Sequence, residues 1–456
     1  MVGIKGVGMT MLAQFLASQG YRITGSDVSE TFMTDQVLRS QGIKVLPGFA
    51  ADNLPQAVDF VIYSTAYNPD SNPELALARK RGIKMLSFAE ALSEFFNQRY
   101  GIAVTGSHGK TTTTAWLGHV LAAAGLAPHV LVGSYVPQFQ GSSLLGDSDL
   151  MVVECDEYQN KLRYYQPKCV ILNNIDYDHP DYFASREDYF QVFRDFVVKL
   201  GKRDVVVANF DDPLVKKAVA GIRARVVSFA LREEAEFRAY DLEAGSEVQT
   251  FMVEMAAGEG AAQDLGRFGV SLAGSHNVSN ALAVIAVSLE MGAELRDIRG
   301  ALADFKGTTR RMEIMGKFRG ALIMDDYAHH PTEIKSTIKG VRERYPQARL
   351  LAVFHPHTYS RTKAFLKEYS QCFEGVDELV VMDIYGSARE QQGGIHSRDL
   401  VAALESGGAH SPGDIKYIPD LDAVYDYLRE HVSGNDLVLL MGAGDVFRVG
   451  ERLLNN

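Results

Sequence analysis

The sequence is poor in cysteine. Its 456 residues include three, Cys155, Cys169 and Cys372, and no two of them have CxxC spacing. Neither a disulfide framework nor a zinc knuckle is therefore expected. The chain also lacks an apolar run close to the about 18 residues that cross a bilayer, and its N-terminus lacks a basic segment followed by an apolar one. We therefore expect a cytoplasmic protein that does not insert into a membrane.

Positive charge is scarce as well. The 46 Lys and Arg residues are outnumbered by 57 Asp and Glu residues, the net charge is −11, and the basic residues form no cluster. Because binding a polyanion needs a basic face, no nucleic-acid partner is expected. With 46% hydrophobic and 23% charged residues, the chain reads as an ordinary globular protein. Its length predicts about two to four domains.

Short β-rich runs alternate with amphipathic helical stretches along the chain, a pattern typical of parallel sheets flanked by helices. We predict an α/β protein of three domains, at residues 1–98, 99–308 and 309–456. Residues 234–273 lose helical periodicity and predict a small antiparallel insertion. The expected strands lie within residues 21–27, 58–66, 83–87, 101–106, 150–156, 169–176, 204–212, 320–328, 348–357, 377–386, 415–419 and 436–444.

The opening MVGIKGVGMT has glycines at positions 3, 6 and 8, spaced GxxGxG and not the dinucleotide GxGxxG. Asp27 follows about twenty residues later, where an acid can hydrogen-bond a ribose. A nucleotide phosphate at a helix N-terminus and a purely structural glycine turn both fit this spacing. Only Met1 and Val2 precede Gly3, whereas a strand usually takes about five or six residues. We therefore expect the first strand to be truncated in this sequence.

A second glycine loop, GSHGKT at residues 106–111, follows an apolar strand and precedes a helix. In that context backbone N–H groups face a triphosphate, the Lys110 ammonium adds a positive charge, and the Thr111 hydroxyl can bind Mg²⁺. The strict GxxxxGK[ST] pattern is not met, because its first glycine would fall on Val104. The alternative is a glycine-rich turn without a ligand. Four consecutive threonines open the helix, and because threonine is a mediocre helix former they favour the phosphate loop.

Acids and a histidine follow two further apolar strands. Glu154 ends LMVVE, at the edge where open parallel sheets bind ligands, and could share Mg²⁺ with Thr111. Asn174 ends the next strand, and Asp178, His179 and Asp181 follow closely. The alternatives are a solvated strand-end acid and a turn with helix-capping acids.

Polar residues also cluster at later helix starts and strand ends. His276, Asn277 and Asn280 open a helix and could contact a base, although a capped helix start explains them equally well. Arg310 and Arg311 lie at the predicted boundary, where arginine could bind phosphate or only solvate a face. Five more candidates lie at strand ends of the third domain: Asp326, His329 and His330, and then His357 and Arg361.

Nine motifs together resemble the Mur ligase family of peptidoglycan synthesis. They occur in the family's order and cover essentially the whole chain: VGIKGVGM, TGSHGKTTTT, VECDEY, NIDYDHPDYF, HNVSNALAVIA, FKGTTRRME, DDYAHHPTEI, FHPHTYSRT and MGAGDV. The resemblance implies a Rossmann-like N-terminal domain that binds a UDP-sugar, a central P-loop ATPase domain, and a Rossmann-like C-terminal domain that binds an amino acid. The first hundred residues would then hold the substrate and not ATP.

The resemblance further implies an ATP-dependent amide-forming ligase that uses Mg²⁺ and an acyl-phosphate route to join L-alanine to UDP-N-acetylmuramate, as a monomer or homodimer. Lys110, Glu154, His179 and Arg311 would be catalytic, and Thr111, Glu154 and His179 would bind the metal. ATP would contact Gly106, Ser107, His108, Gly109, Lys110, Thr111, Thr112, His276, Asn277, Asn280, Arg311, Asp326 and His329. The UDP-sugar would contact Gly3, Gly6, Gly8, Ser26, Asp27, Ser64 and Thr65, and the amino acid would contact His357 and Arg361.

Two departures from the family concern the amino-acid side. Many relatives have Gln in place of His355 and Arg in place of Thr358. Two other functions stay open: a ligase that attaches a whole murein tripeptide to the same UDP-sugar during wall recycling, and a non-catalytic sensor that closes on UDP-sugars. The sensor would be expected to lose catalytic positions, whereas Lys110, Thr111 and Glu154 are present.

Overall fold

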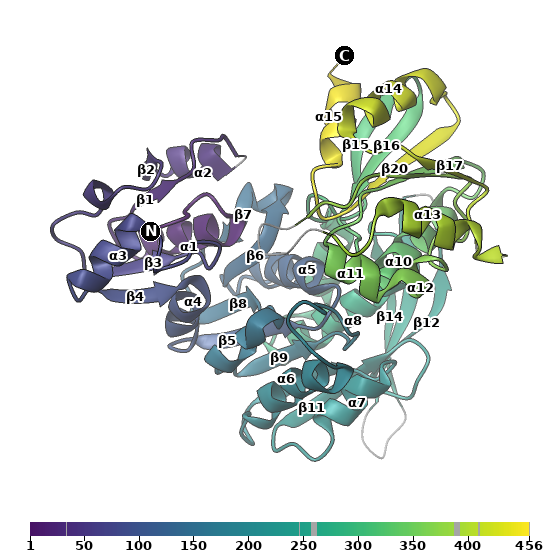
Figure 1. The fold of residues 1–456 in the computed structure, drawn as a ribbon. Helices are drawn as coiled ribbons and strands as arrows, with labels where there is room; N and C mark the ends of the chain where they lie inside the picture. The colour runs from purple at the N-terminus through teal and green to yellow at the C-terminus, as the bar shows by residue number, and fades with distance from the viewer. Residues whose placement is uncertain (33, 246, 257–261, 387–392, 409–410, 456) are drawn as a thin grey trace.

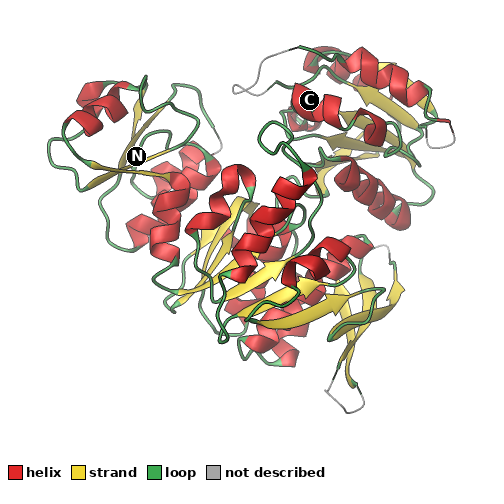
Figure 2. Cartoon of the chain, turned by 60° about the horizontal axis from the view of Figure 1, so that its bottom comes forward, coloured by secondary structure: helices red, strands yellow, loops and turns green. Residues whose placement is uncertain are grey.

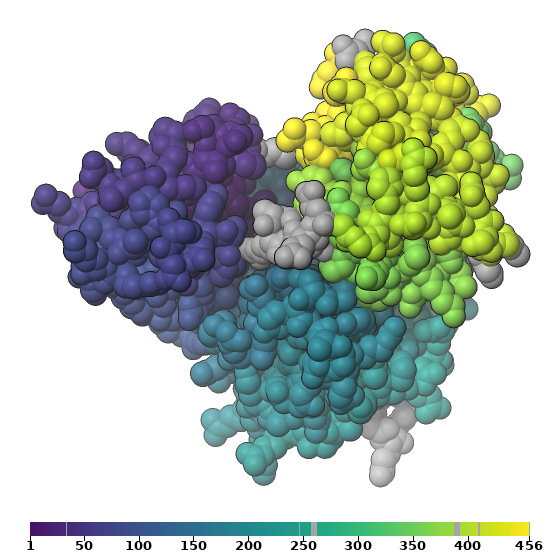
Figure 3. Space-filling view, in the orientation of Figure 1, coloured from purple at the N-terminus to yellow at the C-terminus, as the bar shows by residue number. Residues whose placement is uncertain are grey.

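The computed structural model describes residues 1–456 except 33, 246, 257–261, 387–392, 409–410 and 456. Three α/β regions follow one another along the chain, and we name them N-terminal, central and C-terminal domain by the predicted boundaries (Figure 1). The N-terminal and C-terminal domains flank a hollow above the central domain (Figure 3). Within the described residues, every helix is too short or too polar to span a bilayer.

The N-terminal domain contains two short parallel strand pairs, β1–β2 and β3–β4, with Val2 between them. Val2 forms isolated parallel bridges to Ser26 and Tyr63, so two residues at the start of the chain occupy the place of a middle strand. The elements are α1 (Val7–Ser18), β1 (Thr24–Asp27), α2 (Thr34–Ser40), β2 (Lys44–Pro47), η1 (Ala51–Asn53), β3 (Phe60–Tyr63), α3 (Pro73–Lys80), β4 (Lys84–Ser87) and α4 (Phe88–Phe96).

The central domain is built on a ten-stranded sheet of order β14-β13-β12-β11-β10-β9-β5-β8-β6-β7. Strands β6, β8, β5, β9, β10, β11 and β12 run parallel to their neighbours in that order. The elements are β5 (Tyr100–Thr105), α5 (Lys110–Ala123), β6 (His129–Val136), η2 (Pro137–Phe139), β7 (Gly141–Leu144), β8 (Leu150–Glu154), η3 (Tyr158–Tyr164), β9 (Cys169–Leu172), α6 (Arg186–Val198), β10 (Val205–Asn209), α7 (Pro213–Val219), β11 (Arg225–Ala230), β12 (Phe237–Glu243), β13 (Gln249–Met255), β14 (Gln263–Val270), α8 (Ser275–Glu290) and α9 (Leu295–Asp304).

Helices cover both faces of the central sheet (Figure 2). One core joins the sheet to α5, α8 and α9, and the other joins it to α6 and α7 and to α1 and α4 of the N-terminal domain. The middle strand β9 is buried along its whole length, which explains its uninterrupted apolar sequence. Cys155 and Cys169 lie in this interior, and Cys372 lies in the C-terminal core.

Residues 234–273 add antiparallel strands to one edge of the central sheet. β12 pairs with β11 in parallel, and β12–β13 and β13–β14 pair antiparallel. Residues 246 and 257–261 of the predicted insertion lie outside the described part of the chain.

The C-terminal domain has a six-stranded sheet of order β15-β16-β20-β17-β18-β19, parallel except for β15. Helices α10, α12 and α13 pack on one face, and α14 and α15 pack on the other. The elements are β15 (Glu313–Phe318), β16 (Ala321–Asp326), α10 (Pro331–Arg344), β17 (Arg349–Phe354), α11 (Tyr359–Ala364), α12 (Leu366–Tyr369), β18 (Glu378–Val381), α13 (Ser397–Glu405), β19 (Asp414–Tyr417), α14 (Leu421–His431), β20 (Asp436–Met441) and α15 (Phe447–Leu454).

The predicted boundaries at residues 98 and 308 fall in connections, the first between α4 and β5 and the second between α9 and β15. As domain boundaries they stay predictions. At the second connection Thr309 N donates to Tyr135 O of the central domain at 3.0 Å. This hydrogen bond holds the connection to the central sheet at the point where the chain leaves the central domain.

Replacing Phe15 tests the joint between the N-terminal and central domains. Phe15 is fully buried, and its ring packs edge-on against the rings of His129 in β6 and Phe95 in α4. The ring centres lie 5.4 Å and 5.8 Å from that of Phe15, respectively. We expect Phe15→Ala to lower the free energy of unfolding by about 3–5 kcal/mol, because a cavity replaces the ring. Denaturant titration followed by circular dichroism measures this. The control Val198→Ala removes a side chain that is 48% exposed and should change the value by less than about 0.5 kcal/mol; equal losses in both variants would contradict the prediction.

Candidate active site

The loop between β5 and α5 is held by the residues that follow β9. Ser107 N donates to Asn174 O at 3.1 Å, and His108 N donates to Asn174 Oδ1 at 2.7 Å. Asn174 Nδ2 donates back to His108 O at 3.1 Å. Asp176 N donates to Ser107 Oγ at 2.7 Å, and that hydroxyl also lies 2.8 Å from Tyr189 Oη. These hydrogen bonds hold the loop in a defined shape.

Two glycines of the loop occupy positions that a side chain would not fit. A Cβ on Gly106 would lie 3.0 Å from the backbone N and O of Asn174, and φ there is +132°. A Cβ on Gly109 would lie 2.8 Å from Asn280 Oδ1 of α8, and φ there is +78°. These glycines let the loop approach both the β9 segment and the start of α8.

Lys110 begins α5, and its ammonium group is held by the loop and by a buried acid. Nζ donates to Gly106 O at 2.5 Å, to Ser107 O at 3.0 Å and to Glu157 Oε2 at 2.9 Å. Burial opposes the charged form, but Glu157 raises the pKa of Lys110 above its ordinary value. His179 lies on the other side of Glu157, with Nε2 3.6 Å from Oε1. Lys110 and His179 are thus joined through an acid that was not among the predicted site residues.

Thr111 and Glu154, predicted to share a metal, lie in direct contact. Thr111 Oγ1 donates to Glu154 Oε1 at 2.8 Å, and Gly133 N donates to Glu154 Oε2 at 2.9 Å. His179 is placed beside Glu157 and Asp156 instead, and the ligand atoms of these three residues lie within 4.8 Å of one another. The three predicted metal ligands therefore lie in two groups. Thr111 is with Glu154, and His179 is with Asp156 and Glu157.

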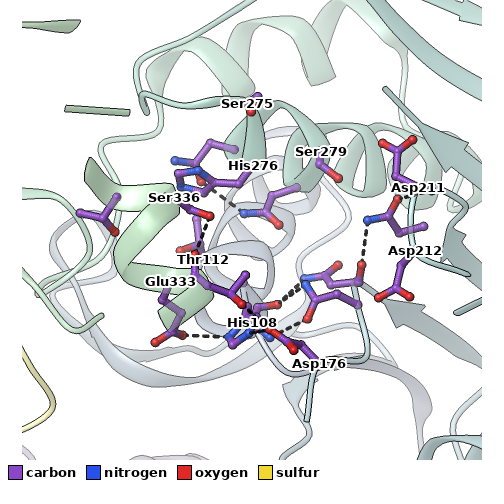
Figure 4. A pocket seen from close by; sticks show the side chains of 18 of the residues that line it. His108, Thr112, Asp176, Asp211, Asp212, Ser275, His276, Ser279, Glu333 and Ser336 are labelled. Atoms are coloured by element: carbon purple, nitrogen blue, oxygen red, sulfur yellow. Dashed lines mark hydrogen bonds and ion pairs between the residues drawn. The ribbon is translucent and has the colours of Figure 1, made fainter. Parts of the chain in front are cut away.

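A cavity of about 870 Å³ opens beside the loop, between the central and C-terminal domains. Its central-domain wall includes His108, Gly109 and Thr112 of the loop and helix start, and its C-terminal wall includes Arg311 and Asp326. Figure 4 shows this arrangement from close by, with α8 and α10 on the walls. Of the predicted ATP contacts, the cavity is lined by His108, Gly109, Thr112, His276, Asn277, Asn280, Arg311 and Asp326.

The first two turns of α8 supply three of these residues. Asn277 Nδ2 donates to Ala273 O at 2.7 Å, and Asn280 Nδ2 donates to Asn277 Oδ1 at 3.2 Å. Burial and the nearby Arg311 lower the pKa of His276 to about 4, so its imidazole is neutral at pH 7. A row of neutral amide and imidazole groups suits an uncharged aromatic base better than a phosphate.

Arg311 and Asp326 bring the C-terminal domain to the same cavity. Asp326 accepts from Met312 N at 2.7 Å and from Ala328 N at 2.8 Å, and these bonds shape the segment that carries Arg311. Arg311 Nη1 lies 3.7 Å from Glu333 Oε1, and its guanidinium lies 5.0 Å from the centre of the Tyr327 ring. Arg311 therefore lines the same cavity as the loop at residues 106–111, although it lies beyond the predicted boundary at residue 308.

The predicted amino-acid contacts lie on the C-terminal side of the same junction. Arg361 Nε and Nη2 donate to the two oxygens of Asp178, at 2.9 and 3.2 Å, and Nη1 lies 3.1 Å from His357 Nδ1. Burial opposes ionisation, but Arg361 holds the pKa of Asp178 well below its ordinary range. His329 lies close by, and burial lowers its pKa to about 3. Asp178, which directly precedes His179, thus connects the two domains.

The residues predicted to bind the UDP-sugar form a separate group in the N-terminal domain. A Cβ on Gly3 would lie 2.5 Å from the Tyr67 ring, so this glycine permits close packing. Asp27 Oδ2 accepts from Lys5 N at 2.7 Å, and its Oδ1 accepts from Tyr67 Oη at 2.9 Å. Ser26 is buried and donates to Glu74. Gly6 and Thr65 are exposed, whereas Gly8 and Ser64 are half-buried.

Three acids that organise the site were not among the predicted residues: Glu157, Asp176 and Glu333. Glu157 could have been suspected from its place in ECDEY, close behind Glu154. Glu333 follows the N-cap His330 by three positions, the spacing of a capping box, but that pattern does not reveal its contact with the phosphate loop.

Family models match three consecutive parts of the chain. "Mur ligase family, catalytic domain" matches residues 1–100, "Mur ligase middle domain" matches residues 104–288, and "Mur ligase, glutamate ligase domain" matches residues 310–444. A UDP-N-acetylmuramate–L-alanine ligase of Desulfitobacterium hafniense is 40% identical over 455 residues, which cover 99% of this chain and 98% of that protein. The chain belongs to the Mur ligase family.

Two further similar proteins support the assignment of this chain to the Mur ligase family. A UDP-N-acetylmuramate–L-alanine ligase of Aquifex aeolicus is 35% identical over 99% of this chain and 96% of its own. The crystal structure of a UDP-N-acetylmuramate–alanine ligase from Thermotoga maritima superposes with a TM-score of 0.81, at 27% identity and with coverage of 100% of this chain and 97% of that one. The predicted three-domain α/β fold is confirmed, and so is the prediction of an ATP-dependent amide-forming ligase.

The charge state of His108 generates a pH prediction. Its Nε2 lies 3.0 Å from Asp176 Oδ2 and its Nδ1 lies 3.2 Å from Glu333 Oε1, and the ring of His330 lies 4.9 Å away. Burial alone would lower the pKa of His108, but the bonds to the two acids raise it from 6.5 to about 9. The stability that the charged ring provides is therefore complete below about pH 6.5 and is lost as pH rises through about 9.

We expect the destabilisation caused by His108→Asn, measured as a difference in unfolding free energy, to shrink between about pH 6.5 and about pH 9. His119→Asn is the control. Because burial lowers the pKa of His119, the change in unfolding free energy caused by this substitution should stay constant across that pH range. A constant difference for His108→Asn would contradict the assigned charge.

Proposed function

We propose that this Mur ligase joins L-alanine to the carboxylate of UDP-N-acetylmuramate, with cleavage of ATP to ADP and phosphate, in peptidoglycan precursor synthesis. The observation that carries the proposal is the cavity at the domain junction. The phosphate loop forms one wall, and Arg311 and Asp326 of the C-terminal domain form the other. The name carried by the Desulfitobacterium hafniense relative, 40% identical over nearly the whole chain, supports the choice of substrates.

The chemistry explains why such a cavity is needed. A carboxylate is a poor electrophile, because its charge is delocalised and its leaving group would be oxide. Transfer of the γ-phosphoryl group of ATP to the muramoyl carboxylate forms an acyl phosphate and ADP. The uncharged amine of L-alanine then attacks the acyl carbon, phosphate leaves, and the amine proton is lost as the amide forms.

Phosphoryl transfer depends mainly on positioning and on neutralising charge. Lys110 and the N–H groups at the start of α5 would hold the triphosphate, and Arg311 would approach its terminal group from the C-terminal domain. Since the two cations belong to different domains, we expect the domains to close when ATP and the sugar bind. His276, Asn277 and Asn280 would contact the adenine, and Asp326 and His329 would contact the rest of the nucleoside.

Mg²⁺ is part of the proposal, and the oxygens at Thr111 and Glu154 fit it. A hydroxyl and a carboxylate 2.8 Å apart at the end of a buried strand form a pair of hard ligands of the kind that Mg²⁺ prefers. His179 is proposed as a further ligand, in a grouping with Asp156 and Glu157. The ion would supply neutralisation of charge on the phosphate oxygens.

We place the UDP-sugar at the glycine loop of the N-terminal domain, near Gly3, Gly6 and Gly8, with Ser26, Asp27, Ser64 and Thr65 around it. We place the amino acid next to His357 and Arg361. Because Asp178 already binds the Arg361 guanidinium through two oxygens, we expect a bound alanine carboxylate either to share this guanidinium or to displace Asp178 from it.

Phosphate release with UDP-N-acetylmuramate and ATP tests the substrate assignment. We expect release to depend on L-alanine and to be far slower with a murein tripeptide, because a site for one alanine need not accommodate a longer chain. Mass spectrometry of the product should show one amide bond formed per phosphate released. Turnover with tripeptide alone would identify a recycling ligase, and ATP binding without phosphate release would identify a sensor.

Removal of the Lys110 ammonium tests the mechanism. We expect Lys110→Ala to lower kcat by at least about 10²–10³-fold, because a charge directed at the transferred phosphoryl group is lost. Lys168→Ala is the matched control, since Lys168 is exposed and lies 3.9 Å from Asp204 on the surface. Amide formation at an unchanged rate in Lys110→Ala would rule out the proposed role of the loop.

A further inference from the structure

Glu333 lies where the C-terminal domain meets the phosphate loop. It stands in the first turn of α10 with its side chain 12% exposed, and Figure 4 shows it directed at His108. Its two oxygens have different partners. Oε2 accepts from the backbone N–H groups of His329, at 3.2 Å, and His330, at 3.4 Å. These bonds cap α10 and fix the direction in which the second oxygen points.

The second oxygen, Oε1, faces two cations of the proposed site. It lies 3.2 Å from His108 Nδ1 in the central domain and 3.7 Å from Arg311 Nη1 in its own domain. A single buried carboxylate oxygen thus lies between the phosphate loop and the arginine that must act on the loop's ligand. Burial opposes ionisation, but the neighbouring His329, His108 and Arg311 hold the pKa of Glu333 well below its ordinary range.

An acid of the central domain contacts the other ring nitrogen of His108. Asp176 Oδ2 lies 3.0 Å from His108 Nε2, and it also accepts from Thr332 Oγ1 of α10 at 2.6 Å. The His108 imidazole is therefore held between one acid from each domain. Helix α10 carries one of these acids, Glu333, and contacts the other, Asp176, through Thr332. Any displacement of α10 would change the surroundings of the loop and the position of Arg311 together.

We propose that Glu333 is a positioning residue of the ligation reaction: by seating α10 on His108, it sets Arg311 opposite the phosphate loop. The proposal rests on the proposed function. Glu333 itself lines the cavity, and in this proposal it acts through Arg311 and His108 and not on the reacting atoms. In this arrangement the arginine reaches the terminal phosphate in a productive orientation only while the two domains are docked at this point.

The competing explanation is that Glu333 only caps α10. The chain offers a matched case for comparison, because His396 and Asp399 form the same histidine–acid capping box at the start of α13. His396 N donates to Asp399 Oδ2 at 2.8 Å, and both residues are exposed there, away from the loop. A substitution at Asp399 therefore removes a capping acid without disturbing the contact with His108.

The test is a double-mutant cycle of Glu333→Gln and His108→Asn, with ATP-dependent phosphate release as the assay. Glutamine still accepts from the helix backbone but loses the charge. We expect Glu333→Gln to lower kcat about 10²-fold and to leave KM for UDP-N-acetylmuramate unchanged, because the sugar binds in another domain. The double variant should lose about as much as the stronger single variant, since both remove the same contact.

Asp399→Asn should leave kcat unchanged, and thermal unfolding should show that every variant remains folded. Three results would overturn the proposal: an unchanged kcat in Glu333→Gln, equal losses in Glu333→Gln and Asp399→Asn, or single losses that multiply in the double variant. If the wild-type protein releases no phosphate with any acceptor, the proposed function fails. The same cycle measured on ATP affinity then still tests the coupling of Glu333 to His108.

Discussion

The seven residues that leave strand β9, residues 173–179, touch almost every part of the site. Asn174 holds the phosphate loop, Asp176 and Tyr177 contact α10, Asp178 binds Arg361, and His179 faces Glu157. This short segment therefore contacts both the loop of the central domain and the C-terminal domain. The shape of the loop and the position of the C-terminal domain depend on the same backbone, so a shift in one is transmitted to the other.

Most of the contacts along this segment involve charged or ionisable groups that are largely removed from water. Such pairs stabilise a protein weakly, because the loss of hydration offsets much of their attraction, but they tolerate little misalignment. An apolar surface of the same size would hold the domains more tightly and less specifically. Since the enzyme must admit ATP and release ADP, a junction of matched charges combines a defined closed arrangement with reversible opening.

The sequence was informative wherever a property is local. Uninterrupted apolar runs predicted β9, β17 and β20, and the glycine loop with its lysine was found from its context between a strand and a helix. The expected strands did not include β2, β6, β7, β11 or β15. Strands β2, β7 and β15 are short or half-exposed and lack a strong apolar signal. Strands β6 and β11 contain apolar runs that were not recognised as strands. The resemblance to a family supplied the domain roles that periodicity alone could not.

The contacts that these acids make between the domains could not be predicted, because the partners lie far apart in the sequence. His108 and Glu333 are 225 positions apart, and Asp178 and Arg361 are 183 apart. Locally, Glu333 is a capping residue and Asp178 precedes a turn, and both descriptions are true. Only the packing of one domain on the other gives these carboxylates their second role.

The three cysteines have a practical consequence. Burial raises the pKa of the Cys169 thiol to about 12 and raises the pKa values of Cys155 and Cys372 well above their ordinary range. None of them can react with a thiol reagent until the surrounding core opens. Because two lie in the central domain and one in the C-terminal domain, rates of alkylation would report the breathing of each core separately, without any introduced label.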